Sequence, residues 1–334
     1  MKKVLITGAA GFIGTHLERR LKDDGHFVVS AGRKPPKYGA NIADEFHVVD
    51  LRDRASTYSL MVRYKFDEVY QLAGDVGGLG HIATGEHDAE IMTNSTRINI
   101  AVLEAARQAK PGKIFFASSQ CVYPDRFEID PFAGERLASE LNLMPRTCRE
   151  SDASFDTFPF AQEKLYAEAL YQAYYRNHGL DVRIGRLGNT YGSFCEWSEP
   201  RSKAVAAICR KVAQAPYAGP VELWGDGSQQ RSFTYVDDVI EGMIRLMDSD
   251  YHLPVNIAHS ETVTIQELFE TVCRVANKVL AWESEPGPVG VHSRGSDNTI
   301  ARKVLGWEPR TSLAMGLAVT YPWVRDQALM KVPA

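Results

Sequence analysis

The first twenty residues constrain the fold of this chain more than any other stretch. A short apolar run at residues 4–7 leads directly into the glycine triplet Gly8-x-x-Gly11-x-x-Gly14, and a helical pattern continues to residue 21. Glycines at this spacing allow a tight turn and let a pyrophosphate approach the backbone at the amino end of the helix. The sequence therefore predicts a dinucleotide site at Gly8, Gly11, Phe12, Ile13 and Gly14.

The same alternation of strand and helix continues through the first part of the chain. Short apolar runs occupy residues 4–7, 26–30, 46–51, 69–74 and 114–117, and a long helix is expected at residues 88–109. Strands that alternate with helices form a parallel sheet covered by helices on both faces. The predicted fold class is therefore α/β, with a doubly wound parallel sheet of the Rossmann type.

The ends of these strands supply further candidate cofactor contacts. The second strand normally ends in an acid that binds the adenosine ribose, but here Arg33 and Lys34 follow it. Two cations favour a 2′-phosphate, hence NADP over NAD, although a solvated basic loop explains the same residues. Asp50 is placed to accept a hydrogen bond from an adenine amino group. The predicted contacts beyond the glycine turn are Arg33, Asp50, Leu51, Leu72 and Ala73.

Composition narrows the class of protein. The net charge of −4, with the two signs interspersed, predicts neither a nucleic-acid interface nor a basic membrane-binding face. Five cysteines without CxxC spacing indicate reduced thiols and a cytoplasmic location. We expect no signal peptide, no transmembrane helix and no metal site.

Reactive side chains gather after the strand at residues 114–117. Ser118, Ser119 and Cys121 follow it, and in an open α/β sheet the chemistry lies just beyond the carboxyl ends of the strands. A cysteine is often only a small buried hydrophobic residue. Its position here makes Cys121 a candidate catalytic thiol as well.

Residues 157–170 start a helix and carry a family resemblance. Lys164 stands where the extended short-chain dehydrogenase/reductases that act on nucleotide sugars have the lysine of a Tyr-x-x-x-Lys pair. Ser119 matches the catalytic serine of that family. The stretch 221–239, which contains ELWGDG at residues 222–227, is very similar to the family's signature. The resemblance implies that Lys164 also contacts the nicotinamide ribose.

Phe160 stands where that family has its catalytic tyrosine. The tyrosine takes the proton from the sugar hydroxyl being oxidised, and phenylalanine keeps the ring but lacks the acidic group. Three explanations fit this departure. They are a substitution introduced to trap a bound ligand, a natural enzyme that uses Ser119 or water instead, and a natural pseudoenzyme that binds ligands without turnover.

The resemblance also implies a division of the chain and a set of substrate contacts. Residues 1–188 would mainly form the NAD(P)-binding domain and residues 189–334 a smaller α/β lobe for the nucleotide sugar. A strand and a helix near 228–260 would return to the first domain. The implied contacts at the sugar are Gly77, Ser119, Gln120 and Lys203. Those at the diphosphate are Asn189, Arg231 and Arg294, and those at the nucleotide are Lys211 and Trp224.

Within the family, the chain is most similar to the 3,5-epimerases of GDP-hexoses. Residues 11–13, 76–82, 118–124, 222–227 and 295–298 and the segment at Lys203 carry this similarity. It implies tightly held NAD, Cys121 as the base and Lys203 as the proton donor on the opposite face of the sugar. It also implies a homodimer formed through the helices at residues 88–109 and 158–178. Four apolar side chains could serve this interface or equally belong to the core: Leu165, Leu170, Tyr174 and Tyr175. A 4-epimerase, a 4,6-dehydratase, an NADPH-consuming reductase and a binding protein remain alternatives.

Overall fold

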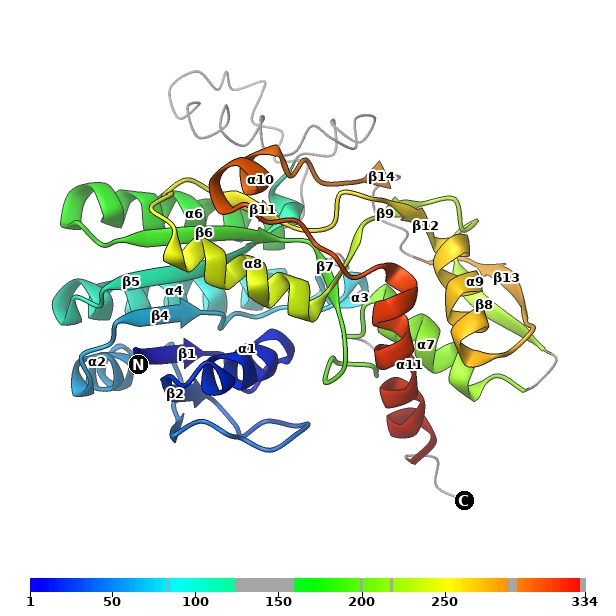
Figure 1. Cartoon of the computed structure of the whole chain (residues 1–334), viewed down its shortest axis with the longest axis horizontal. Helices are drawn as coiled ribbons and strands as arrows, with labels where there is room; N and C mark the ends of the chain where they lie inside the picture. Colours follow the sequence, from blue (N-terminus) through cyan, green and yellow to red (C-terminus); the bar gives the residue numbers. More distant parts are fainter. Residues whose placement is uncertain (83, 124–158, 199–200, 217–218, 288–292, 331–334) are drawn as a thin grey trace.

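The protein has a helix-covered parallel sheet and a smaller lobe beside it (Figure 1). The computed structural model describes residues 1–82, 84–123, 159–198, 201–216, 219–287 and 293–330. The sequence segments 124–158 and 288–292 lie outside the described residues. The first of them begins with Pro124, the last residue of the motif that contains Cys121.

Seven strands form the main sheet, in the order β11-β6-β5-β4-β1-β2-β3, with every pairing parallel. The strands are β1 (Lys3–Thr7), β2 (Phe27–Gly32), β3 (Glu45–Val48), β4 (Glu68–Gln71), β5 (Lys113–Ser119), β6 (Val182–Leu187) and β11 (Val255–Ile257). The order reverses between β1 and β4, which is where open α/β sheets bind their ligands. The predicted doubly wound sheet is confirmed.

Helices cover both faces of this sheet. One face carries α2 (Arg54–Arg63), α4 (Asp88–Ala109) and α6 (Pro159–His178), which pack side by side. The other face carries α1 (Phe12–Asp23) and α8 (Val236–Asp248). Successive strand residues supply opposite faces: Val4 and Ile6 belong to the hydrophobic cluster that includes α8, and Leu5 belongs to the cluster under α4. Both faces are therefore core, as parallel sheets require.

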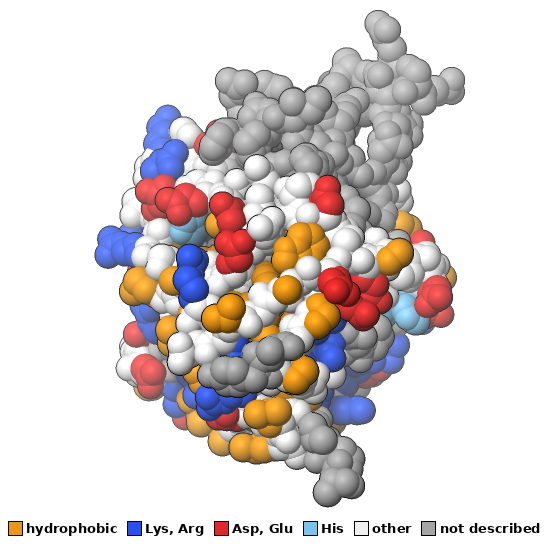
Figure 2. All heavy atoms as spheres, turned by 90° about the vertical axis from the view of Figure 1, so that its right-hand side faces the viewer, with side chains coloured by type: hydrophobic (Ala, Val, Ile, Leu, Met, Phe, Trp, Pro, Cys, Tyr) orange, Lys and Arg blue, Asp and Glu red, His pale blue; other side chains and the backbone are white. Residues whose placement is uncertain are grey.

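The smaller lobe is built on three helices that pack on one another: α7 (Ala204–Gln214), α9 (Ile265–Ala276) and α11 (Leu313–Met330). Its strands pair as β8 (Pro220–Trp224) with β13 (Ala281–Glu285), and as β9 (Gln230–Arg231) with β12 (Val263–Thr264) and β14 (Ser293–Arg294). On the face in Figure 2, hydrophobic side chains lie between acidic and basic ones.

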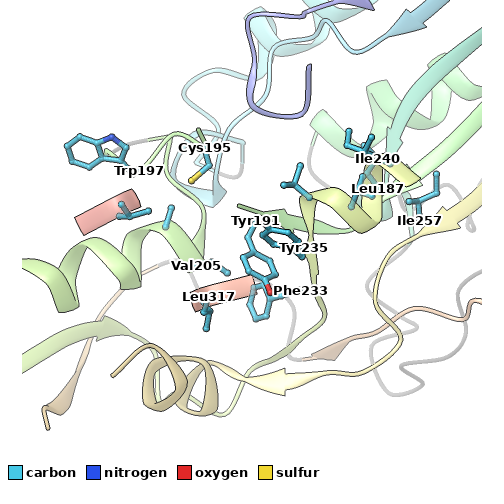
Figure 3. Packing of buried hydrophobic residues seen from close by; sticks show 14 of the residues in the cluster. Leu187, Tyr191, Cys195, Trp197, Val205, Phe233, Tyr235, Ile240, Ile257 and Leu317 are labelled. Carbon is cyan, nitrogen blue, oxygen red and sulfur yellow. The ribbon is translucent and has the colours of Figure 1, made fainter. Parts of the chain in front are cut away.

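A continuous hydrophobic cluster joins the lobe to the sheet (Figure 3). The short strands β7 (Asn189–Tyr191) and β10 (Phe233–Tyr235) pair in parallel at the junction. Tyr191 and Tyr235 meet there edge to face, with ring centroids 5.7 Å apart. Val205 and Leu317 bring the helices α7 and α11 into the same cluster. This shared core fixes the lobe beside the carboxyl ends of the strands.

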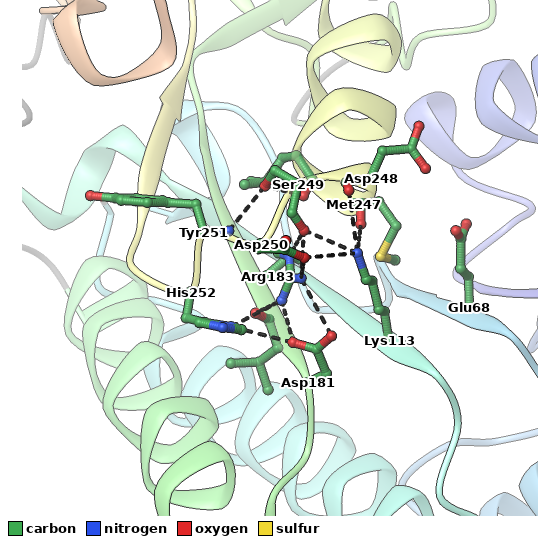
Figure 4. A network of polar contacts seen from close by, with 12 residues as sticks. Glu68, Lys113, Asp181, Arg183, Met247, Asp248, Ser249, Asp250, Tyr251 and His252 are labelled. Carbon is green, nitrogen blue, oxygen red and sulfur yellow. Dashed lines mark hydrogen bonds and ion pairs between the residues drawn. The ribbon is translucent and has the colours of Figure 1, made fainter. Parts of the chain in front are cut away.

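Two cations near the amino ends of β5 and β6 bind the end of α8 (Figure 4). Arg183 is fully buried and donates hydrogen bonds to the carbonyl oxygen of Ser249, at 2.8 Å from Nε and 2.5 Å from Nη2. Lys113 Nζ donates to the carbonyls of Met247 and Ser249, both at 3.0 Å. These carbonyls lie at the carboxyl end of α8, where cations are favourable. The contacts fasten α8 to the start of β5 and β6.

The apolar side chains proposed for a dimer face lie mainly against the protein's own core. Leu165 packs against Val122 and Tyr123, and Leu170, Tyr174 and Tyr175 pack against the cluster under α4. Met92 of α4 and Tyr166 of α6 are instead exposed. The homodimer stays a prediction, and these two residues are its best-placed candidates.

None of the described helices combines the length and hydropathy that a membrane span needs. The four cysteines in the described part of the chain are free thiols. The described residues also hold no group of three or more histidine, cysteine, aspartate or glutamate side chains that suits a metal ion.

A buried ion pair lies behind β5. Glu168 accepts hydrogen bonds from Arg186 Nε (2.8 Å) and Nη2 (2.5 Å) and from the hydroxyl of Ser118 (2.5 Å). Arg186 Nη1 also donates to the hydroxyl oxygen of Tyr123 at 3.2 Å. Both charged side chains are almost completely buried. Burial lowers the pKa of Arg186, but the charge of Glu168, the influence of Tyr123 and the hydrogen bonds to both together outweigh it and leave the pKa raised.

We expect Glu168→Leu to lower the free energy of unfolding by about 3–5 kcal/mol, because it leaves the Arg186 guanidinium buried without a counter-charge. Chemical denaturation measures this loss. The control is Glu308→Ala, which breaks the 2.8 Å pair with Arg302 on the surface and should cost about 0–1 kcal/mol. A loss near the control value for Glu168→Leu would contradict the prediction.

Candidate active site

The turn between β1 and α1 has the form that a pyrophosphate needs. Gly8 has a φ of +71°, and a Cβ added there would lie 2.8 Å from the backbone nitrogen of Ala73. A Cβ on Gly14 would lie 2.5 Å from the carbonyl oxygen of Gly8. No side chain caps α1 at Gly11, so the amides of its first turn remain available to an anion. The turn therefore fits a dinucleotide cofactor.

The predicted adenosine end contains an ion pair that the sequence did not reveal. Asp50 lies two residues beyond β3 and accepts hydrogen bonds from Arg52, 2.9 Å from Nε and 2.5 Å from Nη2. These bonds, with a smaller contribution from Arg33, lower the pKa of Asp50 to about 2. Arg33 thus lies near this carboxylate, as a shared adenosine site requires. Leu51 is buried beside it.

Lys164 and Phe160 lie one turn apart on α6, at the carboxyl end of β4. Lys164 is only 4% exposed, and its Nζ is 5.1 Å from the ring centroid of Phe116 and 5.7 Å from that of Phe160. A Cβ added to Gly74 would lie 3.5 Å from the same Nζ. Gly74 follows Leu72 and Ala73, the predicted contacts beneath the cofactor. The lysine therefore points to the predicted nicotinamide position.

Ser119 and Cys121 meet at the carboxyl end of β5. The 3-10 turn η1 (Gln120–Val122) follows the strand, and the Ser119 hydroxyl oxygen accepts the backbone N–H of Cys121 at 3.1 Å. Cys121 is partly buried and packs against the cluster of Phe160, Ile82 and Ile91. The turn thus places a thiol next to the ring that replaces the expected tyrosine.

Lys203 approaches Cys121 from the lobe. It is the residue before the first turn of α7, and solvent reaches it. Desolvation nonetheless lowers the pKa of Lys203 from its ordinary 10.5, and the electrostatic influence of Cys121 and Cys195 partly opposes this shift. The loop after β4 links the two neighbourhoods, because Gly78 lies against Ser202, next to Lys203, and Ile82 belongs to the cluster against which Cys121 packs. A lysine with a lowered pKa donates a proton more readily.

A glycine loop sets the position of Lys203. Gly78 donates its backbone N–H to the carbonyl of Arg201 at 3.0 Å, and a Cβ on Gly78 would lie 2.2 Å from the carbonyl oxygen of Ser202. Only glycine fits so close to that backbone. A Cβ on the preceding Gly77, a predicted sugar contact, would lie 2.8 Å from the side chain of His81. The loop after β4 is thus tied to the two residues before Lys203.

The predicted diphosphate contacts lie on neighbouring strands of the lobe. Asn189 donates from Nδ2 to the carbonyl of Ser232 at 3.1 Å, next to the end of β9. Arg231 of β9 and Arg294 of β14 are register partners in the parallel pair. The structure brings the backbone positions of these two predicted cations together.

The predicted nucleotide contacts meet at the end of β8. Trp224 is partly exposed, and a Cβ on Gly287 would lie 2.5 Å from its ring. Lys211 Nζ donates to the carbonyl of Glu222 at 2.7 Å and lies 3.7 Å from Glu285. Glu285 is also the register partner of Trp224. Lys211 and Trp224 therefore lie at the same end of the β8–β13 pair. Gln120, in contrast, is buried, and its Oε1 would lie 3.1 Å from a Cβ on Gly188.

Two carboxylates near the site were not singled out from the sequence. Asp75 accepts from Asn94 at 3.1 Å and lies 3.3 Å from His81 and 3.5 Å from Arg201. Burial raises the pKa of Asp75, but these hydrogen bonds and the Arg201 charge outweigh it and leave the pKa lowered. The second is Glu163, beside Lys164. The glycine pair after Asp75 was the only sequence signal near that carboxylate. No sequence signal pointed to Glu163.

Comparison with known proteins identifies the family. The sequence profile described as "NAD dependent epimerase/dehydratase family" matches residues 4–258. The chain belongs to the NAD-dependent epimerase/dehydratase family. NAD is therefore the cofactor, and the family and fold predicted from the sequence are confirmed.

Within the NAD-dependent epimerase/dehydratase family, GDP-mannose 3,5-epimerase of Arabidopsis thaliana is 39% identical over 329 residues, covering 97% of this chain and 82% of that protein. GDP-L-fucose synthase of Escherichia coli (strain K12) is 26% identical over 337 residues, covering 96% of each. Such relatives support a nucleotide-sugar epimerase.

Solved structures agree with the fold. UDP-glucose 4-epimerase from Thermotoga maritima, with UDP-glucose, superposes with a TM-score of 0.79 at 22% identity and covers 97% of this chain and 99% of that one. A tyrosine-to-phenylalanine mutant of UDP-glucuronic acid 4-epimerase from Bacillus cereus was solved with UDP-4-deoxy-4-fluoro-glucuronic acid and NAD. It superposes with a TM-score of 0.78 at 24% identity and covers 97% of this chain and 99% of that one.

Proposed function

We propose that this chain is a GDP-mannose 3,5-epimerase, slowed by Phe160, that converts GDP-mannose to GDP-L-galactose and GDP-L-gulose. The observation that carries the proposal is the loop after β4, which contacts Ser202, next to Lys203, and also supplies Ile82 to the cluster against which Cys121 packs. Inversion at a carbon needs a proton acceptor and a proton donor on opposite sides. The 39% identity with GDP-mannose 3,5-epimerases supports the choice of substrate.

NAD, when bound, supplies a reversible hydride acceptor for carbon 4 of the hexose. A ketone at carbon 4 acidifies the hydrogens on carbons 3 and 5, which no side chain could otherwise remove. Cys121 then takes a proton from one face of the sugar, and Lys203 delivers a proton from the other. The Lys203 ammonium also stabilises the thiolate that acts as the base.

The remaining residues would bind and orient the substrate. Ser119, Gln120 and Gly77 hold the sugar, and Asn189, Arg231 and Arg294 hold the diphosphate, where guanidinium groups form charge-assisted hydrogen bonds. Lys211 and Trp224 line the nucleotide end. Arg33 and Lys34 leave NADP as a second cofactor that the adenosine end accepts. We also propose a cytoplasmic homodimer.

The test is incubation of the protein with GDP-mannose in heavy water, with deuterium at carbons 3 and 5 followed by NMR. We expect exchange at both carbons, slow for the present chain, with no net consumption of cofactor. Exchange at neither carbon, even after Phe160→Tyr, would overturn the proposal. Loss of water would indicate a dehydratase, and net oxidation of NADPH a reductase.

A further inference from the structure

Lys164 has a buried carboxylate as its neighbour. Glu163 Oε2 lies 3.5 Å from Lys164 Nζ, and the two side chains are 0% and 6% exposed. Adjacent helix residues ordinarily point to different sides. Here the long lysine side chain runs into the site, and the shorter carboxylate stays inside the fold. The charge of each group is therefore balanced mainly by the other.

A network of amides fixes the orientation of Glu163. Asn99 of α4 donates from Nδ2 to Glu163 Oε1 at 2.9 Å. Its Oδ1 in turn accepts from Gln71 Nε2 at 3.2 Å and from the Tyr171 hydroxyl at 3.4 Å, and Gln71 accepts from Thr7. Glu163 Oε2 has no hydrogen-bond partner among the described residues. The oxygen that faces Lys164 is thus free to receive a proton.

Burial makes a shared proton between the two groups energetically accessible. Two opposite charges in a dry interior pay a desolvation penalty, and transfer of one proton from ammonium to carboxylate removes both charges without changing the net charge. The rings of Phe116 and Phe160 and the Asn99 hydrogen bond favour the charged forms, which opposes the transfer. The geometry gives the Lys164 proton an acceptor oxygen 3.5 Å from Nζ inside the fold.

Three described ionisable groups near the pair are each held by other surroundings. Burial, and then the charge of Glu163, raise the pKa of Tyr171 well above its ordinary value, so its hydroxyl stays a neutral donor. Glu168, one turn along α6, is held by Arg186. Cys121 packs against the apolar cluster around Phe160.

We propose that Lys164 and Glu163 together replace the missing tyrosine as the base that takes the proton of the hydroxyl being oxidised. This inference rests on the proposed function. The proton of Lys164 passes to Glu163 Oε2, and the neutral amine then accepts the hydroxyl proton while the hydride leaves carbon 4 for NAD. Both protons retrace their paths when the hydride returns. Lys164 is the catalytic residue, and Glu163 is a positioning residue that stores its proton.

The first test needs neither substrate nor cofactor. In Lys164→Met, Glu163 has lost its counter-charge, and we expect its carboxyl group to be protonated at neutral pH. Infrared difference spectra should show a neutral carboxyl band that is absent from the double variant Lys164→Met, Glu163→Gln. A fully ionised Glu163 in Lys164→Met would overturn the proposal, because the carboxylate could not then hold the proton.

The second test compares Glu163→Gln in two backgrounds. In the present chain, transfer of deuterium from carbon 4 of labelled GDP-mannose to the cofactor should slow by about 10²-fold, with KM unchanged. In the protein that carries Phe160→Tyr, the same substitution should slow it by less than about threefold, because the phenol takes the proton. Glu104→Gln, on the surface of α4, is the control and should leave both rates unchanged.

Each result of this comparison is decisive. Equal losses in the two backgrounds would make Glu163 merely structural and overturn the inference. A present chain with no hydride transfer, next to an active Phe160→Tyr protein, would overturn the inference and leave the proposed function standing. Inactivity of both proteins toward GDP-mannose would overturn the proposed function, and with it the inference.

Discussion

Replacement of Phe160 by tyrosine is expected to raise the rate of deuterium exchange at carbons 3 and 5 of GDP-mannose by about 10²–10⁴-fold, the usual contribution of a positioned acid or base. The ring of Phe160 already lies one helical turn from Lys164, with the lysine nitrogen 5.7 Å from its centroid. The substitution adds only a hydroxyl to that ring. The lysine charge would lower the pKa of this phenol and favour its role as a base.

The measurement is NMR in heavy water at saturating GDP-mannose, with the cofactor content of both proteins matched. Phe160→Leu serves as the control, because it removes the ring without adding an ionisable group. It should not exceed the rate of the present chain. An unchanged rate after Phe160→Tyr would contradict the assignment of this position and direct attention to Ser119.

Replacement of Cys121 by alanine is expected to lower exchange at carbons 3 and 5 by about 10²–10⁴-fold, while hydride transfer from carbon 4 continues. The thiol is the group assigned to the proton on carbon. The hydroxyl on carbon 4 has another base, which is Lys164 in the present chain and the added phenol in the Phe160→Tyr protein. The two steps therefore depend on different side chains. The experiment is done in the protein with Phe160→Tyr, where carbon 4 is oxidised quickly.

Two labels separate the steps. Deuterium from the solvent reports on carbons 3 and 5 by NMR, and deuterium placed on carbon 4 reports on transfer to the cofactor by mass spectrometry. Cys273→Ala, which changes a buried thiol of the lobe, should leave both signals unchanged. Lys203→Gln should allow proton removal but block inversion, so that deuterium enters without a change of configuration. Full exchange in Cys121→Ala would refute its role as the base.

Local patterns were enough to predict the Rossmann part of the fold. The glycine triplet follows its strand within a few residues, and the steric need for glycine at Gly14 comes from backbone atoms of Gly8 and Ala9 in the same turn. The spacing of Lys164 and Phe160 is likewise a property of one helix. Patterns of this kind depend on neighbours in the sequence, so the sequence alone contains them.

The partners of the candidate acids and bases could not be predicted in this way. Asp50 stays a predicted adenine contact, but its ion pair with Arg52 could not be predicted from the sequence. Leu165, Leu170, Tyr174 and Tyr175 were considered for a dimer face, but they pack against the protein's own core. The sequence of a helix does not say whether a given charged or apolar side chain is buried or exposed. Their environment depends on which helix packs against them.

The sequence by itself determined the dinucleotide turn, the parallel sheet, the family and the absence of a tyrosine at Phe160. Only the tertiary structure decided that Lys203 of the lobe comes near Cys121 of the sheet, and that Glu163 lies buried against Lys164. The physical reason is that contacts within a turn or a helix follow from covalent geometry. Contacts between β5, α6 and α7 exist only once a shared hydrophobic core has fixed the lobe beside the sheet.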